Sequence, residues 1–201
     1  MPKLLFPILA VVAIAGLIVL WPPQKRASLP PAQTIAADIE PMTTADRIAQ
    51  PPLRQTFTNE PYRLVISAAD QWQTPRARGQ LYEGDTLRWQ KDLPHEYGPR
   101  FALIGPAGQV LLLDEFINVA SPYALTLIDL DGEVVVQRSF DDVQKALDIS
   151  PAILTEQATS GWWISAPPRL HVRSSRALVE TGGTTLEVDL ATGELSRRAD
   201  L

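Results

Sequence analysis

Cysteine is absent from the chain, and its absence excludes several classes of protein. Disulfide scaffolds, thiolate metal centres, cysteine nucleophiles and acylated lipoproteins all need that residue. Histidine is scarce: His95 and His171 lie too far apart for a helical metal motif. The 18 basic residues are outnumbered by 23 acidic ones, which argues against a nucleic-acid-binding surface. We expect no metal, no cofactor and no nucleic-acid partner.

Charge is missing from Leu4 to Trp21, an apolar run of 18 residues. As a helix rising about 1.5 Å per residue it spans roughly 27 Å, close to the hydrocarbon thickness of a bilayer. Pro22-Pro23 then ends the helix. Residues 1–21 are therefore predicted to be a membrane anchor that contacts the lipid bilayer through residues 4–21. The alternative is a signal peptide cleaved after Ala13-Ile14-Ala15.

Proline is concentrated in residues 22–53, where it makes up seven of 32 positions and no aromatic residue occurs. Such a stretch buries too little apolar surface to fold alone, so it is interpreted as a Pro-rich linker. As a flexible coil it reaches roughly 30 Å. The very short tail before the apolar run favours a signal anchor with its amino terminus inside. The chain is then a single-pass membrane protein with a periplasmic or extracellular soluble domain.

Short strand patterns dominate residues 54–201. Hairpins are predicted where apolar, β-branched runs flank Gly105 to Gly108, Leu130 to Gly132 and Gly182-Gly183. The sequence Asp129 to Gly132 is interpreted as a type I′ turn, because the later ligands of a calcium loop are missing. These signals predict a mainly β domain, built as an antiparallel meander.

A small helical insert is predicted at about residues 141–160. Asp141 or Asp142 is the candidate N-cap of a first helix. Ser150, followed by proline, marks the start of a second helix, which a glycine at position 161 follows.

Three segments share a turn that leads into a strand: residues 82–89, 130–135 and 189–195. They resemble the outer hairpins of quinoprotein-type β-propeller repeats, in which an Asp-x-x-Thr-Gly turn precedes the last strand. The resemblance covers only these turns and strands, and the family's cofactor residues have no counterpart here. It implies a partial propeller-like sheet, because 148 residues hold only three to four repeats of about 40 residues. A compact sandwich or barrel is the alternative.

The candidate catalytic residues are His95, Asp114 and Glu115. The first lies in the polar segment from Leu93 to Arg100, and the two carboxylates end a predicted strand. If these segments meet, the histidine can act as a general base that one carboxylate orients. The alternative is a solvated connecting loop shaped by prolines, since no nucleophile or oxyanion motif accompanies the cluster.

The candidate binding residues are Tyr97, Arg100, Trp162 and Trp163. Consecutive side chains of a strand point to opposite faces, so one tryptophan can enter the core while the other contacts a partner. The alternative is that this tryptophan packs beneath the helical insert.

Anchor, linker and the lack of a catalytic motif together predict a binding module outside the cytoplasm. Its partner is expected to be a protein or an envelope polymer held near the membrane. One alternative is a membrane-anchored hydrolase that uses His95, Asp114 and Glu115. Another is a structural subunit of a membrane complex, in which Ala10, Ala13 and Gly16 form a close-packing face of the anchor.

Overall fold

The structure is a computed structural model, and it describes residues 51–171 and 174–199. The predicted membrane anchor and the linker up to residue 50 lie outside the described residues. Within the described part, no helix is both long enough and apolar enough to cross a bilayer.

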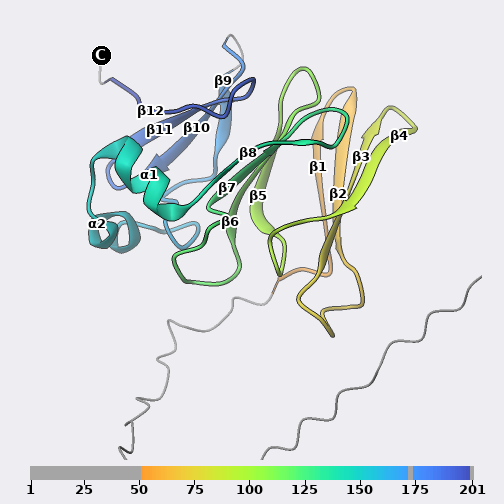
Figure 1. The fold of residues 1–201 in the computed structure, drawn as a ribbon, viewed down its shortest axis with the longest axis horizontal. Coiled ribbons are helices and arrows are strands. Elements are labelled where there is room, and N and C mark those ends of the chain that lie inside the picture. The colour runs from red at the N-terminus through yellow and green to blue at the C-terminus, as the bar shows by residue number, and fades with distance from the viewer. Residues whose placement is uncertain (1–50, 172–173, 200–201) are drawn as a thin grey trace, which may run out of the picture. The chain divides into compact units, whose positions relative to one another are not determined.

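Twelve strands of the described chain form three four-stranded antiparallel sheets, each of which follows the chain in order (Figure 1). Sheet 1 contains β1 (Arg54–Asn59), β2 (Tyr62–Ala68), β3 (Ala77–Glu83) and β4 (Thr86–Asp92). Sheet 2 contains β5 (Pro99–Ile104), β6 (Val110–Glu115), β7 (Leu125–Ile128) and β8 (Val134–Arg138). Sheet 3 contains β9 (Arg169–His171), β10 (Arg176–Thr181), β11 (Thr184–Asp189) and β12 (Leu195–Arg197). The prediction of a mainly β antiparallel meander is confirmed, and the described strands close no barrel.

The predicted hairpins form between β5 and β6, β7 and β8, and β10 and β11. The predicted type I′ turn before β8 is wrong, because only Gly132 of its central residues has a positive φ. Asp129 instead accepts hydrogen bonds from the backbone N–H groups of Asp131 and Glu133 through Oδ1. The Gly132 N–H also bonds to the Asp129 carbonyl, so this is a type I turn followed by a glycine bulge.

Two short helices, α1 (Phe140–Leu147) and α2 (Pro151–Glu156), connect β8 to β9. The N-cap of α1 is Ser139, not the predicted Asp141 or Asp142. Ser139 Oγ accepts the Asp142 N–H at 3.2 Å, and the Asp142 carboxylate accepts the Ser139 N–H at 2.9 Å, which makes a capping box. Ser150 precedes α2 as predicted, but its side chain makes no capping hydrogen bond.

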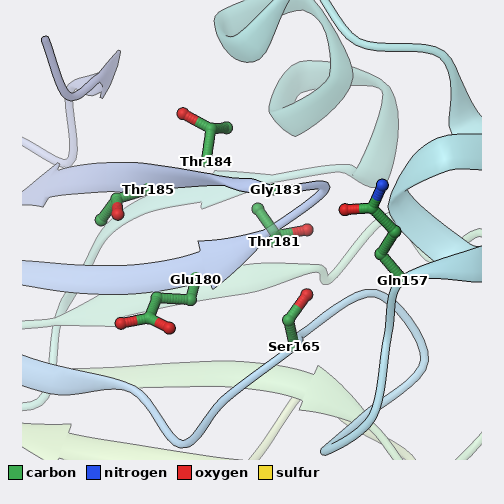
Figure 2. A pocket seen from close by; sticks show the side chains of 7 residues that line it. All are labelled: Gln157, Ser165, Glu180, Thr181, Gly183, Thr184 and Thr185. Carbon is green, nitrogen blue, oxygen red and sulfur yellow. The ribbon is translucent and has the colours of Figure 1, made fainter. Parts of the chain in front are cut away.

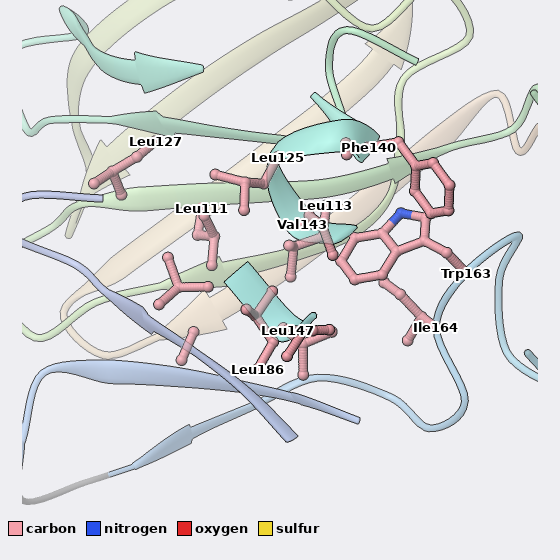
Figure 3. Packing of buried hydrophobic residues seen from close by; sticks show 14 of the residues in the cluster. Leu111, Leu113, Leu125, Leu127, Phe140, Val143, Leu147, Trp163, Ile164 and Leu186 are labelled. Atoms are coloured by element: carbon pink, nitrogen blue, oxygen red, sulfur yellow. The ribbon is translucent and has the colours of Figure 1, made fainter. Parts of the chain in front are cut away.

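The two central strands of sheet 2, β6 and β7, are buried on both faces: their successive residues point to opposite sides, and all of them are buried. One face packs against sheet 3 and the helices, in a cluster that Figure 3 shows around Leu111, Leu113, Leu125 and Leu127. The other face packs against sheet 1 through Leu112 and its neighbours. This double burial explains why β6 and β7 are almost continuously apolar.

Candidate functional site

The connections between strands differ at the two ends of the sheets (Figure 1). At one end they are short hairpins. At the other end lie the longer connections, which contain residues 69–76, 93–98, 116–124 and 157–168, together with the short β10–β11 hairpin, whose Thr181 hydroxyl donates to the Trp163 carbonyl. We call this the long-loop end. Gln55 Nε2 donates to the Pro99 carbonyl there, while Asn59 at the far end of β1 donates to the Ile104 carbonyl, so β1 and β5 run alongside each other in the same direction. Long loops on a rigid scaffold are a common location for binding sites.

Asp114 joins three segments of the long-loop end. Its Oδ2 accepts the backbone N–H of Trp162 at 2.8 Å and lies 3.2 Å from Nε of Arg100. Arg100 also donates from Nε to the Glu115 carbonyl at 2.7 Å and from its guanidinium to Asn118 Oδ1 at 2.6 Å. The structure thus brings together Arg100, Asp114 and Trp162, three of the residues singled out from the sequence.

Asp114 is both strained and poorly solvated. Its backbone has φ of +57° within β6, a left-handed conformation that is uncommon outside glycine but tolerated by Asp. Burial raises the pKa of its carboxyl to about 6, although the Trp162 N–H and the Arg100 charge oppose that shift. Burial likewise raises the pKa of Glu115. Strain and raised carboxyl pKa values occur together at many functional sites.

His95 is enclosed completely, with an exposed fraction of 0%. Neither ring nitrogen makes a hydrogen bond of normal geometry, and the ring lies 6.1 Å from that of Tyr123. Burial lowers the pKa of His95 to about 3, so the ring is neutral at physiological pH. No hydrogen bond joins it to Asp114 or Glu115. In this arrangement His95 lacks the exposure and the orienting partner that a general base uses.

The aromatic candidates divide between loop and core. Tyr97 is half-buried and packs against Trp72 at a ring distance of 5.7 Å. Trp162 is half-buried against Phe140 at 4.7 Å, whereas Trp163 is 1% exposed and belongs to the core. Residue Trp72, in a left-handed conformation with φ of +63°, belongs to the same end; nothing in the sequence signalled that geometry.

Three cavities lie near these loops, one of them between the 116–124 loop and the start of α1. A second, a hollow of about 210 Å³, is lined by Glu96, Glu115 and residues of the 117–123 loop. The third cavity, of about 380 Å³, lies beside the β10–β11 hairpin, and none of the predicted site residues lines it (Figure 2). Its lining is polar: Gln157, Ser165, Glu180, Thr181, Gly183, Thr184 and Thr185. No group of three or more potential metal ligands occurs among the residues that the structure describes.

Comparison of the chain with protein-family models, with curated proteins and with solved structures gives no match.

Proposed function

We propose that this protein is a membrane-anchored binding module that presents its long-loop end to a partner outside the cytoplasm. The gathering of the long connections at one end of three packed sheets supports the proposal most strongly. The described chain also enters its first strand at this end, because β1 begins at Arg54 and Leu53 is hydrogen-bonded to Ala68 at the start of the 69–76 loop. If the linker joins the domain at this end, the distance from the loops to the membrane is limited by the length of the linker.

The ionisable groups of this end hold the loops together. The Arg100 and Asp114 pair binds the 157–168 loop to sheet 2, and Ser121 and the Glu96 backbone both hydrogen-bond to Glu115. Ionisable groups that make such contacts fix the shape of the surface, and this role requires no chemical reaction. This arrangement favours binding over the hydrolase alternative.

The hydrolase remains a second candidate because Glu115 lines a hollow and has a raised pKa. A carboxyl group whose pKa is raised by burial is a suitable general acid. Glu115→Gln would abolish any hydrolysis of an ester or glycoside probe while it preserves the shape of the site. Retention of such an activity in this variant would show that Glu115 is not the general acid, and absence of the activity from the wild-type protein would contradict the hydrolase.

Two exposed valines provide a matched test of the binding surface. Val119 is 51% exposed on the long-loop end, and Val134 is 42% exposed beside a short hairpin at the opposite end. Full-length protein in detergent would be used to capture partners from solubilised membranes and to co-sediment with insoluble envelope polymer. Val119→Asp should weaken binding, and Val134→Asp should leave it unchanged. Equal retention by both variants would contradict the proposal.

A further inference from the structure

A second surface lies on sheet 1, away from the long-loop end. It becomes visible when the turns between the third and fourth strands of each sheet are compared. These turns contain Gly84 in sheet 1, Gly132 in sheet 2 and Gly193 in sheet 3, all with positive φ. They are also the three turn-and-strand segments that share a sequence pattern.

In sheets 2 and 3 this turn is covered by the preceding sheet. A Cβ on Gly132 would lie 2.9 Å from the ring of Trp89, which projects from β4 of sheet 1. A Cβ on Gly193 would overlap Val136, which projects from β8 of sheet 2. In each case an apolar side chain of a fourth strand, Trp89 or Val136, covers the turn of the next sheet. A register shift precedes both side chains in their strands.

In sheet 1 the same position is uncovered. Apart from the glycine itself and its two chain neighbours, no atom of the described residues lies within 4 Å of a Cβ built on Gly84. Instead there is an open hollow of about 610 Å³ beside the glycine. It is lined by residues of the β1–β2 and β3–β4 turns and their flanking strands: Thr58, Glu60, Pro61, Tyr62, Arg63, Gly84 and Asp85.

The outer face of sheet 1 suits a protein partner. Leu64, Ile66 and Leu81 point toward sheet 2, so Arg63 and Tyr82 lie on the opposite face. The Arg63 guanidinium stacks on the Tyr82 ring at 4.3 Å. Arginine and tyrosine are enriched among the residues that dominate binding energy at protein interfaces.

The outer face of sheet 3, on the opposite side of sheet 2 from sheet 1, has a different character. On sheet 3 the core residues Val179 and Leu186 face sheet 2, which leaves Glu187 on the outer face between two arginines. Arg176 lies 2.7 Å and Arg198 lies 3.8 Å from its carboxylate. Leu178, which pairs with Glu187 on that face, is only 4% exposed, so the face offers no free large apolar side chain to a hollow such as that at Gly84. A second copy joined head to tail is therefore a poor occupant.

We infer that the outer face of sheet 1 is a docking surface for a partner protein whose edge strand inserts a large apolar side chain into the hollow at Gly84. The inference extends the contact that is made twice within the chain, and it is independent of the proposed role of the long-loop end. The expected contact reproduces Trp89 over Gly132, with Arg63 and Tyr82 at the centre of the interface.

The chain supplies its own probe for this surface. A cyclised peptide of residues 77–92 reproduces the β3–β4 hairpin and carries Trp89. Its binding to full-length protein in detergent would be measured by biolayer interferometry, after circular dichroism shows that the hairpin is folded. A peptide with Trp89→Ser is the control. We expect the substitution to weaken binding by about tenfold or more, the effect of losing one dominant side chain.

Variants of the protein locate the site. Asp85→Trp fills the hollow and should reduce hairpin binding by a similar factor. Glu133→Trp adds the same bulk at an exposed position in the corresponding turn of sheet 2, and it should change nothing. A folded hairpin that fails to bind would overturn the inference, as would binding that Asp85→Trp leaves intact.

Light scattering tests the remaining occupants. We expect the protein not to associate with itself through this hollow. A dimer that Asp85→Trp abolishes would show that the occupant is a second copy and would overturn the inference. Cross-linking from position 85 to residues 1–50 of the same chain would likewise overturn it, because the hollow would then be filled internally.

Discussion

The carboxylate of Asp114 accepts the backbone N–H of Trp162, a residue 48 positions further along the chain, at 2.8 Å. This single bond connects the end of β6 to the loop that follows the helical insert. Because β6 belongs to the central sheet, the contact fixes a peripheral loop to the most rigid part of the molecule. Its acceptor is nevertheless a carboxylate that burial disfavours in its charged form.

Asp114→Asn is expected to raise the free energy of unfolding at pH 8. The folded-state pKa of about 6 exceeds the ordinary value of 3.8, so the charged form costs the fold about 1–3 kcal/mol above pH 6. Asparagine avoids that cost and accepts the left-handed backbone. The gain should shrink as the pH falls from 6 to 4, where the wild-type carboxyl takes up its proton. Urea denaturation at several pH values measures this. A loss of stability at pH 8 would show that the ionised carboxylate's bonds outweigh its burial.

His95→Phe should make the protein more resistant to acid. The pKa of His95 is about 3 in the fold and 6.5 in the unfolded chain, so the unfolded state binds the proton more tightly as the pH falls below 6.5. Phenylalanine removes this penalty and two unpaired ring nitrogens. At pH 5 the variant should exceed the wild type by about 2 kcal/mol more than at pH 8. His171→Phe, at an exposed position, is the control. A stability difference that does not change with pH would show that the pKa of His95 is not lowered in the fold.

Gly161→Ala is expected to destabilise the long-loop end by about 1–3 kcal/mol through overpacking. Its Cβ would overlap Oδ2 of Asp114, while its backbone is not in the left-handed region. The cost should therefore depend on the carboxylate. In an Asp114→Gly background the same alanine should cost much less, which a double-mutant cycle would reveal. Additive effects would mean that the loop absorbs the methyl group by moving.

Gly84→Ala and Gly193→Ala form a matched pair. Both glycines have positive φ, so alanine costs each turn about 1–2 kcal/mol of backbone strain. Only at Gly193 does the added methyl overlap the neighbouring sheet, at Val136. The second variant should therefore have the lower melting temperature, and Val136→Ala should recover part of the difference. Equal melting temperatures would contradict the contact between sheets.

The sequence allowed the hairpins to be predicted because their turn residues act locally. The Gly182-Gly183 pair, with φ of +55° and +72°, and the runs beside it suffice to define β10 and β11. Strands β1 and β3 escaped prediction because each contains few large apolar residues and forms by pairing with β2. The N-cap of α1 was assigned two or three residues late, since Asp142 resembles a cap but serves as the third residue of a capping box.

For the site, the sequence identified polar residues but not what they contact. Arg100, Asp114 and Trp162 were each singled out, yet their convergence depends on the fold of sheet 2 and the course of the 157–168 loop. The burial of His95 was also invisible, because a histidine between prolines in a polar segment looks solvated. Local composition carries no information on which loops meet.

The double burial of sheet 2 has a consequence for synthesis on the ribosome. Each sheet is contiguous in sequence, so sheet 1 can pack against sheet 2 as soon as β8 has emerged. The leucines on the opposite face of sheet 2 stay uncovered by sheet 3 until residues 169–197 have been translated. During that interval one apolar face of sheet 2 in the nascent chain is covered only by the helical insert. A premature stop before β9 would release a product that aggregates, not a smaller working domain.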